Sequence, residues 1–138
     1  MKFQVFINEK KNTVAVKAIN PIHEYYKEFT LFYNKFGFHP YVETFEEFVD
    51  KYERQIDKMV GIATCNVEAG DVFDAELGEK IARERYLKLF ETYRIKMYQM
   101  ITNKLDKATS ESFRRINYCT YRYKERDNKI NNIIARHK

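Results

Sequence analysis

The sequence contains no tryptophan, and it has few residues that break or cross-link a fold: two prolines, four glycines and two cysteines among 138 residues. Scarce glycine and proline exclude collagen-like and linker-like chains. Two isolated cysteines, Cys65 and Cys119, exclude a disulfide-stapled scaffold, and without a signal-peptide pattern we expect reduced thiols in a cytoplasmic protein. Apolar runs stay far below the roughly 20 residues that cross a bilayer, so we expect no membrane partner.

The motifs of familiar catalytic and cofactor sites are also missing. Neither GxGxxG nor GxxxxGK[ST] occurs, so no glycine-rich loop is present to hold a phosphate. The histidines His23, His39 and His137 lie far apart, and no HExxH, CxxC or Cys/His cluster predicts a metal site. We therefore expect a protein that is not an enzyme and that uses no cofactor and no metal.

The first part of the chain favours a small antiparallel sheet. Residues 2–8 and 13–19 alternate apolar and polar side chains on either side of a polar turn, a pattern that predicts a β-hairpin over residues 2–19. Residues 59–65 alternate in the same way, and Gly61 and Ala63 are small enough to permit close packing. We predict a third strand here, added to the hairpin.

Two helices are predicted between the hairpin and the third strand, as an αα insertion over residues 21–58. Asn20-Pro21 marks the start of the first helix, since proline at the first helical position loses no hydrogen bond. Thr44 and Glu47 form a capping-box pattern, which predicts that the second helix covers residues 45–58.

The last part of the chain is predicted to form two long helices. Asp74 caps one over residues 75–103 and Ser110 caps the other over 111–134, with the short connection of a helical hairpin between them. Apolar residues on more than one side of the earlier helix favour contact with another subunit, and hence a homo-oligomer. Together these elements predict a single α+β domain: a small antiparallel β-sheet, an αα insertion and two long C-terminal helices.

Positive charge is concentrated near the C-terminal end. The net charge is +5, and residues 113–138 hold eight lysines or arginines against two acids. This concentration favours an anionic partner, either a nucleotide or a nucleic acid. Arginines beside aromatic side chains suit a phosphate next to a base. The candidate ligand-binding residues are Arg83, Arg85, Arg94, Arg114, Arg115, Tyr118, Arg122 and Arg126.

An alternative for these arginines is pairing within their own helices. Four glutamates lie three or four residues from one of them, which is the spacing of ion pairs on a helix surface; they are Glu79, Glu84, Glu91 and Glu125.

Arg85 is set apart because it falls between Ile81 and Leu89 on the predicted apolar stripe of its helix. A half-buried cation needs a partner. That partner is either Asp71 or Asp74 at the start of the same helix, or an anionic ligand.

A group of short motifs adds a resemblance to this picture. It comprises Val14-Ala15-Val16, Gly61-Ile62-Ala63-Thr64-Cys65, Asp71-Val72-Phe73-Asp74, Gly78, Ile81-Ala82, Arg85 and Lys88. This pattern resembles small proteins encoded by phages and prophages of low-GC Gram-positive bacteria. The expected architecture, a small sheet followed by two long helices, is also similar to the Thoeris anti-defence sponges. Those phage proteins assemble into oligomers and sequester cyclic ADP-ribose-type signals without cleaving them.

Three classes of function follow from the residues and the resemblance. The leading hypothesis is a phage-encoded anti-defence protein in the host cytoplasm that sequesters an anionic cyclic nucleotide signal without catalysis. The second is a macromolecular binding protein, either an anti-CRISPR-type inhibitor of a host defence complex or a DNA- or RNA-binding protein acting through its basic C-terminal helix. The third is an unrecognised nuclease or phosphodiesterase.

Overall fold

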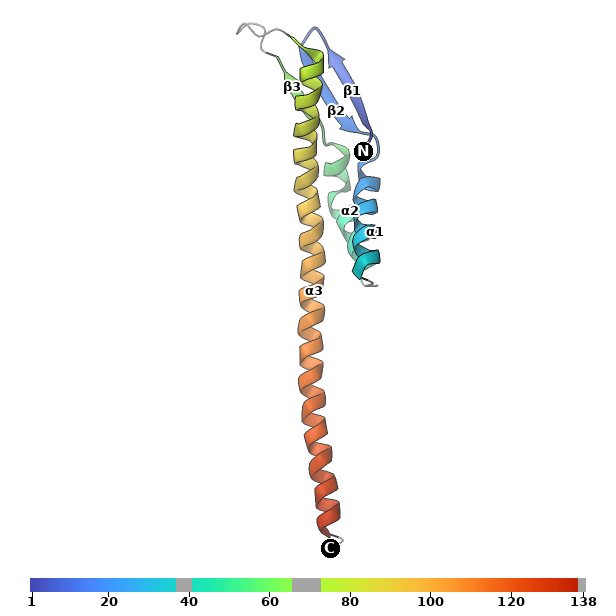
Figure 1. Cartoon of the computed structure of the whole chain (residues 1–138), viewed down its shortest axis with the longest axis vertical. Helices are drawn as coiled ribbons and strands as arrows, with labels where there is room; N and C mark the ends of the chain where they lie inside the picture. The colour runs from blue at the N-terminus through green and yellow to red at the C-terminus, as the bar shows by residue number, and fades with distance from the viewer. Residues whose placement is uncertain (37–40, 66–72, 137–138) are drawn as a thin grey trace. The chain divides into compact units, whose positions relative to one another are not determined.

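The computed structural model describes residues 1–36, 41–65 and 73–136, and it confirms the predicted α+β class. In chain order it contains strands β1 and β2, helices α1 and α2, strand β3 and helix α3 (Figure 1). The chain divides into two compact units, Met1–Ile101 and Thr102–Lys138, which we call the first and the second unit. The first unit holds the sheet, α1, α2 and the beginning of α3.

The predicted hairpin and third strand form one antiparallel sheet in the order β1-β2-β3. β1 is Phe3–Asn8, β2 is Thr13–Ala18 and β3 is Gly61–Thr64. Asn12 ends the hairpin turn with a φ of 50°, a left-handed conformation that asparagine adopts more readily than most residues. The side chains of β2 alternate between buried and half-buried, as the sequence predicts.

One edge of β3 is not paired with another described strand. The Cys65 N–H donates to the carbonyl oxygen of Asn12 at 2.9 Å. Every second residue of a strand directs its backbone groups the same way, so Gly61 and Ala63 also direct theirs toward β2. Ile62 lies between those two and directs its N–H and carbonyl away from β2. The carbonyl of Ile62 therefore lies on the free edge.

The αα insertion is present, with one correction. α1 is Pro21–Phe36, and the Asn20 side chain accepts a hydrogen bond from the N–H of His23 at 3.4 Å, as expected for a helix cap. α2 is Tyr41–Asp57, so it begins before Thr44, and the predicted capping box is wrong. Thr44 lies in the first turn of α2 and its side chain is buried, so it does not cap the helix.

α3 is a single helix, Ala75–Arg136, and the predicted division into two helices over 75–103 and 111–134 is wrong. Asp74 caps its start as predicted, since its Oδ1 accepts hydrogen bonds from the N–H groups of Glu76 and Leu77 at 3.0 and 3.2 Å. Residues 105–109 contain neither glycine nor proline, so nothing there interrupts the hydrogen-bond ladder. Ser110 lies within the helix and caps nothing.

One face of the sheet packs on the beginning of α3. Val14, Val16 and Ala63 form a buried cluster with Ala82 of α3. Gly61 permits this approach, because a Cβ at that position would collide with the carbonyl oxygen of Ala82 and lie 2.7 Å from the backbone nitrogen of Tyr86. The small residues of β3 thus set the distance between the sheet and α3.

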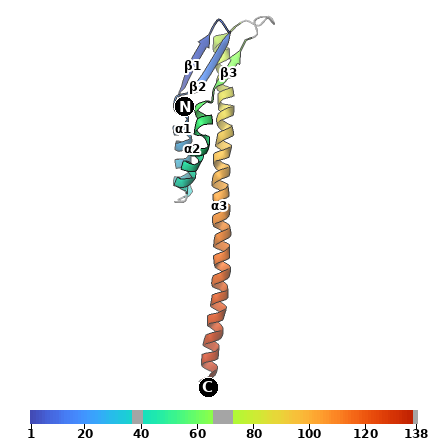
Figure 2. The ribbon, with the colours of Figure 1, turned by 180° about the vertical axis from the view of Figure 1, so that it is seen from behind.

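Aromatic side chains join α1 and α2 to α3, and the three helices lie side by side in the first unit in both views (Figures 1 and 2). The ring of Tyr25 stacks on Phe90 with centroids 4.1 Å apart and meets Phe48 edge-on at 5.4 Å. Tyr52 of α2 meets Tyr93 of α3 edge-on at 5.5 Å. The core of the first unit is therefore aromatic beside α1 and α2, whereas beneath the sheet a small aliphatic cluster is flanked by Phe3 and Phe73.

Candidate functional site

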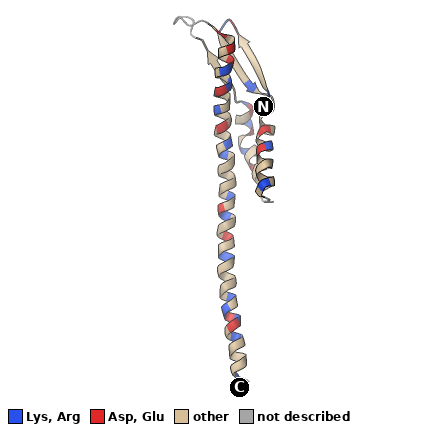
Figure 3. Ribbon diagram, in the orientation of Figure 1, with Lys and Arg blue, Asp and Glu red and all other residues tan. Residues whose placement is uncertain are grey.

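All eight predicted ligand-binding residues lie on α3, but they fall into two groups. Arg83, Arg85 and Arg94 belong to the first unit, and the other five belong to the second. Positive and negative side chains are interspersed along the helix (Figure 3). The candidates of each unit therefore have their own set of neighbouring acids.

Arg83 makes two contacts within the first unit. Its guanidinium forms an ion pair with Glu79 at 2.7 Å, one helical turn earlier. It also lies over the ring of Phe3 of β1, 5.2 Å from the ring centroid. The predicted intrahelical pairing with Glu79 is confirmed, and Arg83 fastens the first turns of α3 to the sheet.

Arg85 is exposed, so the expectation that it is half-buried is wrong. The buried stripe of α3 runs through Ala82, Tyr86 and Phe90, one position away from the stripe inferred from the sequence. The Arg85 guanidinium donates to the carbonyl oxygen of Ile62 at 2.6 Å. The partner of Arg85 is thus the free edge of β3.

Of the two aspartates proposed as partners of Arg85, Asp74 caps α3, and Asp71 lies outside the described residues.

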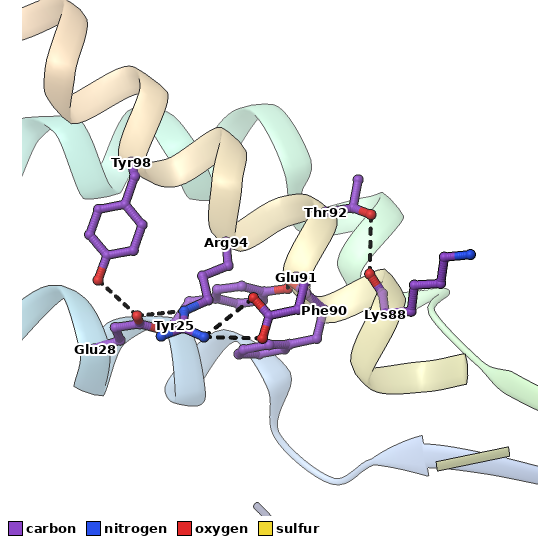
Figure 4. A network of polar contacts seen from close by, with 8 residues as sticks. All are labelled: Tyr25, Glu28, Lys88, Phe90, Glu91, Thr92, Arg94 and Tyr98. Atoms are coloured by element: carbon purple, nitrogen blue, oxygen red, sulfur yellow. Dashed lines mark hydrogen bonds and ion pairs between the residues drawn. The ribbon is translucent and has the colours of Figure 1, made fainter. Parts of the chain in front are cut away.

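Arg94 belongs to a polar network between α3 and α1 (Figure 4). Its Nε donates to Glu28 at 2.6 Å, and Nη1 donates to Glu91 at 3.0 Å. The same Glu28 oxygen accepts the Tyr98 hydroxyl at 2.7 Å. The hydrogen bond that Arg94 donates to Glu28 raises the pKa of the guanidinium. Burial, with a further contribution from Glu28, raises the pKa of Tyr98 to about 12.

The second unit is exposed along nearly its whole described length. From residue 102 to residue 136 the structure leaves every side chain exposed except Lys104, Leu105, Arg122 and Glu125. Arg122 and Glu125 cover one another, since they form an ion pair at 2.7 Å.

The remaining candidates of the second unit differ in their partners. Arg114 and Arg115 both lie near Glu111, at 3.8 and 3.2 Å. Tyr118 is 64% exposed. Among the described residues, Arg126 has no acidic partner. Among the described residues of the second unit, some cations thus lie near an acid, whereas Arg126 has no acidic partner.

Helical periodicity gathers these cations on one face of the second unit, within about one third of the helix circumference. We call this surface the basic face; its members are Lys107, Arg114, Arg115, Tyr118, Arg122, Arg126, Lys129 and Arg136. The acids on this face are Glu111 and Glu125. Positive charge therefore exceeds negative charge along the whole face.

Sequence reasoning missed three members of the basic face: Lys107, Lys129 and Arg136. Lys107 falls in the predicted connection between two helices, which does not exist. The signal for the other two is present in the sequence, because Arg115, Arg122, Lys129 and Arg136 follow one another at steps of seven residues.

The first unit contains a cavity of about 320 Å³ beside the beginning of α3. It is lined by Ala63, Thr64, Cys65, Phe73, Asp74, Leu77, Gly78 and Ile81. None of the eight candidate residues borders it. The predicted arginines therefore do not converge on this cavity.

Two other kinds of feature are absent from the described residues. No group of three or more histidine, cysteine, aspartate or glutamate side chains there is arranged to hold a metal ion. No described helix is both long and apolar enough to span a membrane.

Comparisons with protein-family models, with curated proteins and with solved structures gave no match to this chain. The resemblance to phage-encoded proteins therefore stays a prediction.

Proposed function

We propose that this chain is a non-catalytic binding protein whose basic face contacts the phosphate backbone of a nucleic acid. The observation that carries the proposal is the row of cations repeated every seven residues from Arg115 to Arg136 on an exposed helix. A regular row of positive charge matches a polymer of phosphates better than it matches a single small anion.

The chemistry of the basic face supports a phosphate partner. Arginine presents a planar fork of donors that fits phosphate oxygens, and most of these cations are arginines. Exposed Tyr118 lies among them and offers a ring on which an unpaired base can stack. At about 1.5 Å per residue, the face from Lys107 to Arg136 extends for roughly 44 Å, enough to follow many successive phosphates.

Internal ion pairs do not remove this capacity. Arg115 and Arg122 pair with Glu111 and Glu125 on an open helix surface, where such pairs contribute at most about 1 kcal/mol. A phosphate displaces a carboxylate from such a pair at little cost. Arg126 needs no displacement, because no described acid pairs with it.

Sequestration of a cyclic nucleotide stays a prediction, and the first unit offers it little support. Arg83 and Arg94 are held by Glu79 and Glu28, and Arg85 is bonded to the sheet. The anti-defence role and the host-cell cytoplasm as its place of action depend on the resemblance, and they stay predictions as well.

The proposal is tested by fluorescence anisotropy with labelled duplex DNA, single-stranded DNA and RNA over a series of salt concentrations. We expect binding to at least one of them, with an affinity that falls steeply as salt rises. The variant R115A/K129A/R136A removes three cations of the basic face. It should bind more weakly and lower the slope of log affinity against log salt by about one for each phosphate that the variant no longer neutralises.

The matched control is K2A/K10A/K11A, which removes the same charge from exposed lysines of the first unit. It should bind almost like the unmodified chain. Equal losses in the two triple variants, or no binding to any of the three nucleic acids at low salt, would overturn the proposal. A thermal shift that saturates with a cyclic nucleotide, alongside no nucleic-acid binding, would favour sequestration instead.

A further inference from the structure

The second unit carries an apolar stripe in addition to its basic face. Apolar and small residues, with one arginine among them, recur at alternating steps of four and three over about four heptads, the spacing of a coiled-coil seam. We call this row the seam; it consists of Leu105, Thr109, Ser112, Ile116, Cys119, Tyr123, Arg126, Ile130 and Ile133. In heptad notation, Thr109, Ile116, Tyr123 and Ile130 occupy position a and the others position d.

The seam has no cover within its own unit. Ile116, Tyr123 and Ile130 are 57%, 73% and 54% exposed. Ile116, Cys119 and Tyr123 also border a shallow apolar hollow on the helix surface, the kind of hole that receives a side chain from a facing helix. A helix with this much exposed apolar surface gains most of its stability in water from packing against a partner.

We infer that the partner is a second copy of the same helix, in a parallel two-stranded coiled coil with the two seams in register. Charge complementarity points to this occupant. Arg122 occupies position g, and Asp127 occupies the following position e, so in a parallel pair each Arg122 faces Asp127 of the other copy. Asp127 has no ion-pair partner among the described residues and is available for this contact.

The polar member of the seam fits the same arrangement. Arg126 at position d packs beside position e of the facing helix, which again is Asp127. An antiparallel pair would instead place the g positions Arg115, Arg122 and Lys129 of one helix against the same set on the other, where like charges repel. A polar residue within the seam fixes the register and the number of the strands.

This inference stands apart from the proposed function, because the coiled coil forms or fails to form without any nucleic acid. If both hold, the dimer presents two rows of cations, one on each side of the coiled coil, related by its two-fold axis. Arg115, Lys129 and Arg136 flank the seam without entering it, so the variant used to test nucleic-acid binding leaves the seam intact.

The test is sedimentation equilibrium of the full chain over a wide range of concentrations. We expect the mass of a dimer for the unmodified chain and of a monomer for I116D/I130D, which places four carboxylates in the paired seams. The matched control Y121D/N128D adds the same charge away from the seam and should remain a dimer. A monomeric unmodified chain, a trimer or tetramer, or a dimer that survives I116D/I130D would overturn the inference.

Direction and register are read from a disulfide. In a C65S/C119S background, S112C places a single thiol at position d, away from the middle of the seam. A parallel in-register pair brings the two thiols together, and mild oxidation should convert most of the protein to a linked dimer. An antiparallel pair keeps them apart, so a non-covalent dimer without this cross-link would overturn the parallel arrangement.

Discussion

The hydroxyl of Tyr25 on α1 donates to the backbone carbonyl oxygen of Phe90 on α3 at 2.8 Å, and the two rings stack with centroids 4.1 Å apart. The pair joins positions 65 residues apart in the sequence. A single tyrosine thus supplies both apolar contact and a directional bond between α1 and α3. Burial raises the pKa of its phenol far above the usual value.

Two buried tyrosines allow a matched test of this bond. Y25F should lower the free energy of unfolding by about 1 kcal/mol, because it removes a hydrogen bond while the Phe90 carbonyl keeps its place in the helix ladder. Y86F should leave that free energy unchanged or raise it by up to about 1 kcal/mol. The reason is that the Tyr86 hydroxyl is buried without a hydrogen-bond partner among the described residues.

Urea denaturation of both variants and of the unmodified chain measures the difference. Equal losses in Y25F and Y86F would contradict the assignment, because they would show that the Tyr86 hydroxyl also makes a stabilising bond.

The fold was largely predictable from the sequence because its local signals agree with its packing. The hairpin, the start of α1 and the Asp74 cap all follow from short patterns that the structure satisfies. The helical hairpin was wrong because Ser110 is a good cap in isolation. A helix stops only where its ladder is interrupted, and Ser110 is preceded by good helix formers.

The free energy of unfolding should decrease at alkaline pH. Burial raises the pKa of Tyr86 to about 12, whereas the unfolded phenol titrates near 10. Between these values the unfolded chain has released the proton and the folded chain has not, so the free energy of unfolding decreases as pH rises. Y86F should flatten this decline by on the order of 2 kcal/mol in urea titrations between about pH 9 and pH 12.

The control for the alkaline prediction is Y118F, which alters an exposed phenol. It should leave the alkaline decline unchanged. A decline that Y86F and Y118F alter equally would show that burial at Tyr86 is not its cause.

The close approach of β3 and α3 predicts opposite tolerance at two glycines. G61A should lower the free energy of unfolding by about 3 kcal/mol or more, because the added methyl meets the backbone of α3 at Ala82 and Tyr86. G78A should cost much less. Its methyl meets only the Val14 side chain, at 2.9 Å, and alanine favours a helix by about 1 kcal/mol over glycine.

Thermal denaturation followed by circular dichroism distinguishes the two glycine variants. A G61A protein as stable as G78A would show that the sheet and α3 are farther apart than the structure places them.

The Glu28 network should contribute more than a helix-surface ion pair. E28Q weakens the bonds to Arg94 and Tyr98 and should lower the free energy of unfolding by about 1 kcal/mol. The control E24Q breaks only the pair with Lys27 on the same helix, at 3.0 Å, and should change it by less than about 0.5 kcal/mol. The two glutamate side chains are equally exposed, so the comparison isolates the contact between α1 and α3.

The candidate site was less predictable than the fold. Arg115, Arg122 and Arg126 share a face because a helical period is readable from sequence. The partners of Arg94 and Arg85 were not readable, because Glu28 and the Ile62 carbonyl lie 66 and 23 residues away along the chain. Contacts at such separations depend on how the elements pack, and a one-residue error in the buried stripe of α3 was enough to misplace Arg85.

Asn12 has two structural roles. It ends the hairpin turn, and its carbonyl oxygen accepts a hydrogen bond from the N–H of Cys65. Tips of surface hairpins usually tolerate insertions and deletions. Here a change of length between Asn8 and Thr13 would also move the acceptor that anchors the end of β3. Variation in loop length among descendants of this chain should therefore be sparse at this tip, even though the tip is exposed.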